Sequence, residues 1–456
     1  MPFCLRFAAG FSIIMPSLLK ENAMSTPIVK PAAITGFPEY LPEERLLEQK
    51  ILDTVRSVFE SHGFCSIETP VVEKLDVLLS KSADTNKEMY VLGRLQAEEK
   101  EEAKMGLRYD LTVPFARYVA QHENDLVFPF KRYQMQPCWR GERPKLGRYR
   151  QFTQCDIDIV AREKLALEYD ALIPAVVCEA WQKIGFENIR LQISNRKILA
   201  GFAEGLGIEK VGDTLRVLDK LKKIGEDGVR EMLTELCLTE QQISACLKIA
   251  AISTTDLSFA DKVRALGIQN ETLELGLNEL TECVKLYASL CKVPYQVDMS
   301  LVRGFDYYTG TTYEVQLLGT DFADSIGGGG RYDNLASTMT KSRLPGVGMS
   351  MGISRALGVA LKLGLIKTGA KSPTEVLVVN VDGSDKSKML DVADKLRKRG
   401  IKTEVYLEGG KLAKQLKYAN DKGIPYVWFD IDSTIKDMQS GEQQVADPNK
   451  WSPTQK

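Results

Sequence analysis

The sequence predicts an α+β protein in which a helical segment interrupts a sheet domain and a small α/β domain follows. Strand-like alternation ends near residue 193 and returns at 295–318, after a long stretch with helical spacing. Residues 367–373, rich in Lys, Ser, Gly and Pro, have the composition of a linker. Beyond them strands and helices alternate, which indicates a mostly parallel sheet covered by helices.

Composition restricts the class of protein. A length of 456 residues predicts two or three domains, and a net charge of −1 means that any contact with nucleic acid must come from local patches. No apolar run reaches about 18 residues, so we expect no transmembrane helix. Nine cysteines without a CxxC pair and only two histidines predict reduced thiols, no zinc site and no histidine-based nucleophilic catalysis.

The first element of the sheet domain is a helix over 41–63, because Leu47, Ile51, Val55 and Phe59 recur on one face. A strand over 64–69 ends at Pro70. A strand-like segment over 107–110 precedes a helix, which we expect Thr112 to cap. Residues 1–35 form an extension. Residues 1–20 hold two cations and no acid, which fits either a mitochondrial presequence or a plain extension upstream of Met24.

Residues 131–140 and 149–160 are predicted to form a hairpin whose loop contains Pro144 and Gly147. Side chains alternate along a strand, so Arg150 should share one face with Phe152, Gln154, Asp156 and Asp158. A polyanion with a flat base suits the first part of this face, and a small cationic or hydrogen-bonding group suits the second. The alternative is a solvated basic hairpin that contacts nucleic acid through charge alone.

The remaining elements follow in order. We expect a helix over 168–185, a strand over 189–193 and helices over 195–290. Strands are expected over 295–299, 311–318 and 346–352, with a flexible turn at the four glycines 327–330 and a helix over 353–364. In the last domain strands are expected over 376–381, 402–406 and 424–429, with helices over 386–400 and 412–423. The latter helix presents Lys411, Lys414 and Lys417 on one side, either to RNA or to solvent.

Three stretches resemble one family. Residues 139–158 (WRGERPKLGRYRQFTQCDID) resemble motif 2 of class II aminoacyl-tRNA synthetases, and their end is similar to the histidyl family. Residues 301–308 (LVRGFDYY) resemble that family's signature, and residues 107–114 (LRYDLTVP) resemble its first histidine-binding segment in the eukaryotic form, with Asp at 110 and 158 where bacterial forms usually carry Glu. The segments ending at Pro70 and spanning 346–364 resemble motifs 1 and 3.

The resemblance implies a catalytic domain with the class II antiparallel sheet flanked by helices, a helical insertion and a C-terminal anticodon-binding domain. The implied boundaries are 1–35 for the extension, 36–195 and 293–366 for the catalytic domain, 196–292 for the insertion and 374–456 for the last domain. It also implies a homodimer joined through motif 1, in the cytoplasm, with mitochondria as an alternative.

The implied reaction joins L-histidine to tRNA(His) with ATP, accompanied by Mg²⁺ and without zinc. Catalytic roles fall to Arg140 and Arg303. Histidine would contact Asp110, Thr112, Arg140, Gln154, Asp158, Arg303, Tyr307 and Tyr308. ATP would contact Arg140, Glu142, Arg148, Phe152 and Arg355. Arg148 has the alternative of an ordinary loop residue and Phe152 that of a core residue; Asp156 has no assigned role.

Three rival functions stay open at this point. A synthetase-like regulatory protein without catalysis typically lacks active-site arginines or histidine-binding groups, and all of these are present. A related synthetase for glycine, proline or threonine would not carry LVRGFDYY. An RNA-binding module without chemistry would leave Arg303 and the glycines of 346–352 unexplained.

Overall fold

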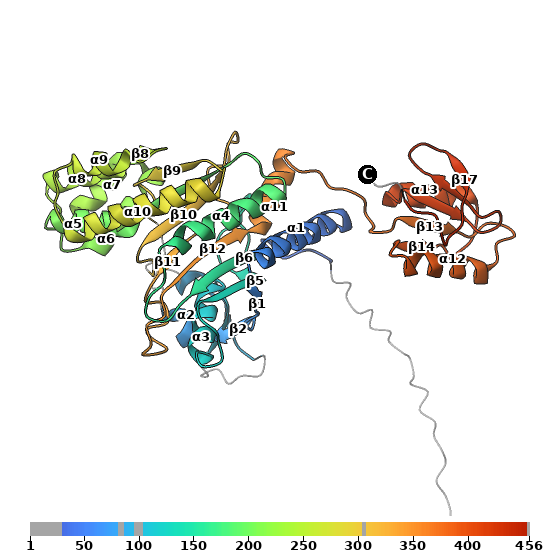
Figure 1. Ribbon diagram of the computed structural model, residues 1–456, viewed down its shortest axis with the longest axis horizontal. Helices are drawn as coiled ribbons and strands as arrows, with labels where there is room; N and C mark the ends of the chain where they lie inside the picture. Colours follow the sequence, from blue (N-terminus) through green and yellow to red (C-terminus); the bar gives the residue numbers. More distant parts are fainter. Residues whose placement is uncertain (1–29, 81–85, 95–103, 303–306, 454–456) are drawn as a thin grey trace, which may run out of the picture. The chain divides into compact units, whose positions relative to one another are not determined.

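The structure is a computed structural model that describes residues 30–80, 86–94, 104–302 and 307–453 (Figure 1). Most of the predicted N-terminal extension, residues 1–29, lies outside the described residues. None of the helices within the described ranges is long and apolar enough to cross a membrane.

The largest sheet contains nine of the described strands. Their order is β1 (Cys65–Ser66), β5 (Phe130–Trp139), β6 (Gln151–Val160), β12 (Gly346–Gly352), β11 (Gly327–Tyr332), β10 (Thr311–Leu317), β7 (Ile189–Asn195), β9 (Tyr295–Asp298) and β8 (Ser253–Thr254). Neighbours from β5 to β7 are antiparallel, whereas β1 and β9 join in parallel. The predicted antiparallel sheet is therefore confirmed, with one parallel pair at the β1 margin and another, β7–β9, one strand in from the β8 margin.

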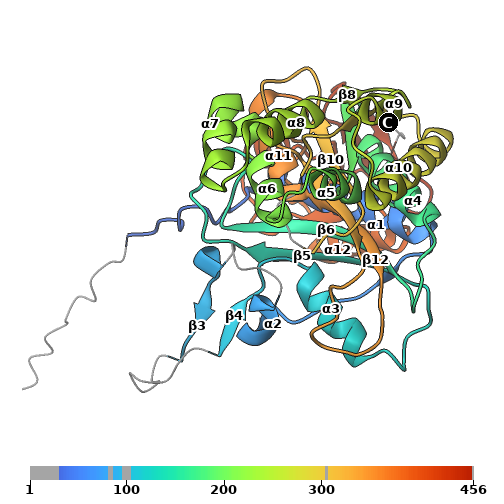
Figure 2. The same ribbon diagram turned by 90° about the vertical axis from the view of Figure 1, so that its left-hand side faces the viewer.

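The two faces of this sheet pack differently. Helices α1 (Pro42–Ser61) and α4 (Glu168–Lys183) cover one face, where Phe59 and Trp181 pack with Cys155, Ile157 and Ile159 of β6. Helix α3 (Thr112–Gln121) packs on the opposite face (Figure 2). Near α3 lie α2 (Leu75–Leu79), η1 (Asn86–Glu88) and a small sheet of β2 (Val72–Lys74), β4 (Met105–Leu107) and β3 (Val91–Leu92). The residues that alternate with these along β6, among them Asp156 and Asp158, thus face the α3 side.

The four glycines at 327–330 form a buried central strand, and the predicted flexible turn is wrong. They are part of β11, which pairs with β10 and β12. A Cβ atom on Gly329 would lie 2.1 Å from the carbonyl oxygen of Gly348. The missing side chains let the strands approach closely, and for the same reason the sequence carries no alternating pattern that would indicate a strand.

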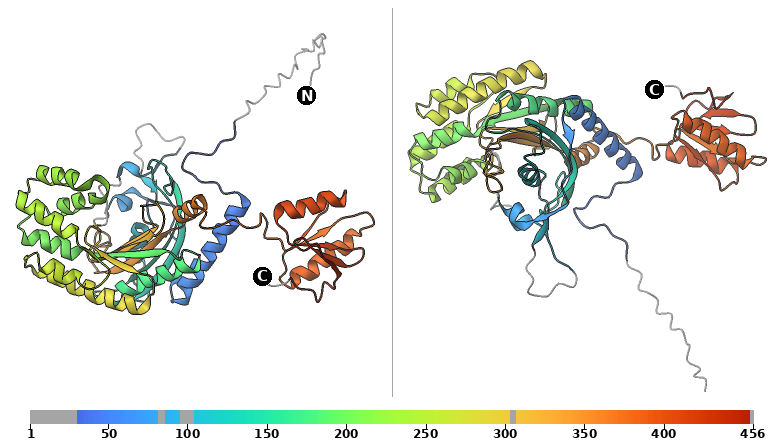
Figure 3. Two further views of the ribbon diagram at one scale, coloured as in Figure 1. Left: turned by 90° about the horizontal axis from the view of Figure 1, so that it is seen from above. Right: turned by 60° about the horizontal axis from the view of Figure 1, so that its bottom comes forward.

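The predicted helical segment leaves the sheet after β7 and rejoins it at β9. It contains α5 (Arg196–Gly205), α6 (Val211–Leu218), α7 (Leu221–Glu235), α8 (Glu240–Ala250), α9 (Phe259–Arg264) and α10 (Glu271–Leu290). Figure 3 shows these helices gathered in one group. The short strand β8, which the sequence did not indicate, pairs with β9 and joins the segment to the sheet.

Helix α11 (Ile353–Leu363) follows β12 and precedes the predicted linker at 367–373. The C-terminal sheet has the order β14 (Thr403–Val405), β13 (Val376–Val379), β15 (Tyr426–Phe429), β16 (Thr434–Asp437) and β17 (Gln443–Val445). Val376 and Val378 pack toward α12 (Lys386–Lys398), while Leu377 and Val379 pack toward α13 (Leu412–Lys422). The first three strands are parallel as predicted, but β16 and β17 are antiparallel additions whose polar sequence gave no strand signal.

Candidate active site

One cavity of about 930 Å³, including its open mouth, lies on the α3 side of the large sheet. Its walls come from β6, β11, β12, the start of α3 and the hairpin loop. All of the predicted site residues that fall within the described ranges line it: Asp110, Thr112, Arg140, Glu142, Arg148, Phe152, Gln154, Asp158, Tyr307, Tyr308 and Arg355. The predicted catalytic residue Arg303 lies outside the described residues.

Asp158 is the most firmly held side chain of the cavity. Arg132, fully buried on the neighbouring strand β5, places Nη2 at 2.6 Å from Asp158 Oδ2, and the hydroxyl of Tyr332 donates to Oδ1 at 2.6 Å. Gly348 on β12 faces the same carboxylate, and a Cβ atom there would lie 1.8 Å from Oδ1. The sequence analysis did not single out Arg132 or Tyr332, since each is brought to Asp158 only by strand pairing.

Three carboxyl groups are buried around the inner part of the cavity. Burial raises the pKa of Asp110, and it raises the pKa of Asp156 to about 7 and that of Asp158 to about 6, although Arg132 opposes the latter two shifts. Within the described residues, Oδ1 of Asp156 accepts no hydrogen bond. A group of buried carboxyls with raised pKa values favours a ligand that brings positive charge or hydrogen-bond donors.

The start of α3 differs from the expected cap. The carboxylate of Asp110 accepts a hydrogen bond from the backbone N–H of Val113 at 3.0 Å. Thr112 is already inside the first turn and makes no capping contact, so its predicted capping role is wrong. An Asp side chain that satisfies a helix N-terminus is fixed in direction, and here Asp110 and Thr112 both border the cavity.

Arg140 lies between two aromatic rings. Its guanidinium carbon is 4.4 Å from the ring centroid of Tyr109 and 5.0 Å from that of Phe152, and its Nε donates to the carbonyl of Tyr109 at 3.2 Å. Phe152 lines the cavity, and its ring is only half-buried, which disfavours the core alternative. Two rings and one carbonyl hold the Arg140 cation in place beside the cavity, so it is available to an anionic ligand.

The outer part of the cavity is basic and tied to the hairpin loop. Arg148 pairs with Glu142 at 3.2 Å, and Lys145 pairs with Asp324 at 2.7 Å. Arg355, in the first turn of α11, donates to the carbonyls of Gly147 and Ser325, both at 2.7 Å. Arg150 was predicted to share the face of Phe152 and Asp158, but it is not among the residues that line the cavity. The strand β6 begins only at Gln151, and Nε of Arg150 donates to the carbonyl of Glu142 at 3.3 Å.

Two further polar residues line the cavity: Ser350, which the sequence analysis did not single out, and Asp156, to which it gave no role. Gln154 donates to the hydroxyl of Ser350, which comes from β12 across the sheet. Asp156, opposite Ser350 in the strand register, lies between Gln154 and Asp158 on the cavity side. Alternation along β6 already indicated Asp156, whereas Ser350 lies among glycines and methionines that carry no functional signal.

Comparison with known proteins identifies the family. The profile described as histidyl-tRNA synthetase matches residues 36–356, and that of an anticodon binding domain matches 375–446. The histidine–tRNA ligase of Thermobifida fusca is 47% identical over 93% of this chain and 98% of its own length; that of Micrococcus luteus is 43% identical over 92% and 96%. A crystal structure of histidyl-tRNA synthetase from Nostoc matches with a TM-score of 0.81 and 36% identity, covering 91% of this chain and 97% of that one.

These relatives are bacterial, so they do not support the eukaryotic assignment or the mitochondrial alternative. The eukaryotic assignment rested on Asp in place of Glu at positions 110 and 158. These two residues weigh little against 47% identity to a bacterial relative over 93% of the chain. The same identity favours a synthetase over an inactive regulatory relative. The chain therefore belongs to the histidyl-tRNA synthetase family of aminoacyl-tRNA ligases.

Proposed function

We propose that the cavity joins L-histidine to ATP and that the resulting histidyl-adenylate passes its histidyl group to tRNA(His). The observation that carries this proposal is the division of one cavity into an inner part with three buried carboxyls and an outer part with arginines. The inner part suits the ammonium and imidazole groups of histidine. The outer part suits a triphosphate.

Histidine would lie with its ammonium group near Asp110, Thr112 and Gln154. Its imidazole would reach Asp158 and Tyr308, with Tyr307 behind them. Specificity follows from burial, because an amino acid without ring nitrogens would leave part of the hydrogen-bonding capacity of the buried Asp158 carboxylate unused, beyond what Arg132 and Tyr332 satisfy. Arg140 and Arg303 would hold the carboxylate.

ATP would occupy the outer part. Its adenine would stack on Phe152 and its amino group would donate to Glu142. Arg148 and Arg355 would hold the phosphate tail, which requires Arg148 to exchange its present contact with Glu142 for phosphate. Arginine suits these positions since it stays charged and its fork matches phosphate oxygens.

The reaction needs orientation and charge stabilisation and no covalent enzyme intermediate. A histidine carboxylate oxygen attacks the α-phosphorus, the bond to the bridging oxygen breaks, and diphosphate leaves with the electron pair. Arg140 would stabilise the charge that develops on the α-phosphate, and the family resemblance gives the same role to Arg303. A terminal ribose hydroxyl of tRNA then attacks the carbonyl carbon and AMP leaves.

Mg²⁺ would enter as part of the ATP substrate. Among the described residues, no three His, Cys, Asp or Glu side chains gather as a metal site, and Asp324 is already paired with Lys145. The ion would therefore be held mainly by phosphate oxygens and water, as Mg²⁺ prefers. The absence of zinc stays a prediction.

The wider organisation is also part of the proposal. We assign residues 36–195 and 293–366 to catalysis, 196–292 to a helical insertion and 374–456 to binding of the tRNA anticodon arm. We also propose a homodimer through α1 and β1, in the cytoplasm. Support comes from the family match and from the separate apolar cores of the C-terminal sheet.

Isotope exchange between pyrophosphate and ATP tests the proposal. Purified protein should catalyse exchange with histidine and not with glycine, proline or threonine, and it should then charge tRNA(His). Exchange that does not require histidine would reject the substrate assignment. Tight binding of RNA without any exchange would indicate a binding module or a regulatory protein.

A further inference from the structure

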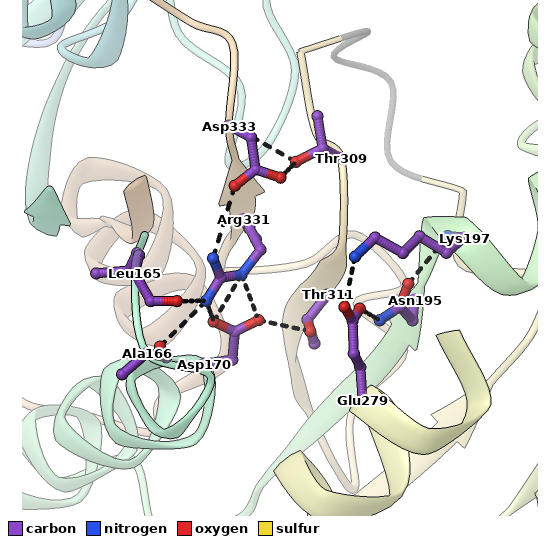
Figure 4. Close-up of polar contacts among 10 residues, drawn as sticks. All are labelled: Leu165, Ala166, Asp170, Asn195, Lys197, Glu279, Thr309, Thr311, Arg331 and Asp333. Atoms are coloured by element: carbon purple, nitrogen blue, oxygen red, sulfur yellow. Dashed lines mark hydrogen bonds and ion pairs between the residues drawn. The ribbon is translucent and has the colours of Figure 1, made fainter. Parts of the chain in front are cut away.

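A buried ion pair lies behind the wall of the cavity that Tyr307, Tyr308 and Tyr332 form. Asp170 of α4 is fully buried and accepts from Nη2 of Arg331 at 2.8 Å, from its Nε at 3.1 Å and from the hydroxyl of Thr311 at 2.7 Å (Figure 4). The backbone carbonyl of Asp170 accepts from the Tyr313 hydroxyl at 2.7 Å. One side chain of the helix thus holds β10 and β11 together.

Arg331 is engaged on every side. Besides Asp170, its Nη2 donates to the carbonyls of Ala166 and Leu165 at 3.1 and 3.3 Å, and its Nη1 lies 3.6 Å from Asp333. A Cβ atom on Gly310 would lie 2.9 Å from Arg331 Cδ. The guanidinium fills its space, so a shorter or differently shaped cation could not make the same set of contacts.

The pair is linked to the histidine side of the cavity by short connections. The N–H of Thr309 donates to the carbonyl of Arg331 at 2.9 Å, and the Thr309 hydroxyl donates to Asp333 at 2.5 Å. Thr309 directly follows Tyr307 and Tyr308. On β11 the next residue after Arg331 is Tyr332, which faces the opposite side and donates to Asp158. Both tyrosine segments are therefore anchored at Arg331.

The Tyr308 ring also depends on this anchor for its packing. A Cβ atom on Gly330, the residue before Arg331, would lie 2.6 Å from Tyr308 Cδ1. Residue 330 and the Tyr308 ring are therefore in close contact, and a shift of β11 at Arg331 would move one cavity wall. A buried ion pair contributes little net stability compared with apolar residues of the same size, but its fork geometry fixes position.

We propose that Asp170 and Arg331 form a positioning pair that sets Tyr308 and Tyr332 at the distance required to bind the imidazole of histidine. This inference rests on the proposed function of the cavity. Neither residue touches the substrate; both act through the strand and segment that carry the tyrosines. Loss of the pair should weaken use of histidine while use of ATP is preserved, because the ATP side is held by Arg355 and the hairpin loop.

The test compares Asp170→Asn and Arg331→Lys with Glu279→Gln. Glu279 holds Asn195 at 3.0 Å and pairs with Lys197 nearby in Figure 4, but within the described residues it makes no hydrogen bond or ion pair with the tyrosine segments. Each variant is assayed at a temperature where circular dichroism finds it fully folded. Asp170→Asn and Arg331→Lys should raise KM for histidine roughly 10- to 100-fold, as misplacement of about 1 Å does, with KM for ATP within about threefold. Glu279→Gln should leave both KM values unchanged.

The outcomes separate the two proposals. Wild-type protein without histidine-dependent exchange would overturn the proposed function, and the pair's role with it. Normal wild-type exchange with an unchanged KM for histidine in both pair variants would overturn the positioning role alone. An equal rise in KM for histidine and for ATP, or loss of folded protein in both pair variants, would mean that the pair serves only stability. Either result would also overturn the positioning role.

Discussion

Substitution of Gly348 by Ala should damage histidine recognition chiefly by crowding the carboxylate of Asp158. The added Cβ would lie 1.8 Å from Asp158 Oδ1 and 2.3 Å from Cγ, whereas real Cβ contacts stay beyond 3.0 Å. The carboxylate must therefore move by at least about 1.2 Å, the difference between 3.0 and 1.8 Å. That shift breaks the 2.6 Å contacts with Arg132 and Tyr332.

The expected size follows from the lost contact. A hydrogen bond to a charged group contributes about 1.5–3 kcal/mol, and 1.4 kcal/mol is a factor of ten, so KM for histidine should rise about 10- to 150-fold. KM for ATP should change little, since the phosphate positions lie at the other end of the cavity. Pyrophosphate exchange with each substrate varied in turn measures both values.

Gly212→Ala is the matched control, because a Cβ atom there meets nothing within 4 Å. It should leave both KM values unchanged. A folded Gly348→Ala protein with wild-type KM for histidine would refute the assignment of Asp158 to the imidazole, and an equal loss for histidine and ATP would mean that the residue maintains only the shape of the cavity.

Three further predictions follow the same reasoning. Arg303→Ala should slow adenylate formation by roughly 10²-fold, as loss of one charge-stabilising donor does, with a far smaller change in histidine affinity; unchanged exchange would remove Arg303 from catalysis. Burial raises the pKa of Asp156 to about 7, so between about pH 4 and 7 the folded protein holds a proton that the unfolded chain has lost. The free energy of unfolding should therefore fall as the pH rises from 4 toward 7. Thermal unfolding of Asp156→Asn should therefore show a smaller decline over pH 4–7 than wild type, and identical profiles would contradict the raised pKa. A chain that ends near residue 367 should fold and make adenylate but lose charging of tRNA, and binding of the intact chain should weaken with salt; a folded truncated chain with full charging would show that residues 374–456 do not bind RNA.

Periodicity alone predicted much of the framework of this protein. The apolar spacing of Leu47 to Phe59 corresponds to α1, and alternation along 149–160 correctly put Phe152, Gln154, Asp156 and Asp158 on one face of β6. These features depend on residues close together in the chain, whose side-chain directions follow from helix and strand geometry. The motifs quoted from residues 107–114 and 139–158 likewise contain most of the residues that line the cavity.

Only the tertiary structure decided which distant groups meet there. The glycines at 327–330 have no side chains and hence no period, so their place as a central strand depends on the strands beside them. Arg132, Tyr332 and Gly348 reach Asp158 from three different strands, and Asp170 reaches Arg331 from a helix 161 residues away in sequence. Such partners are set by strand register and by close packing between elements, and local sequence carries no record of either.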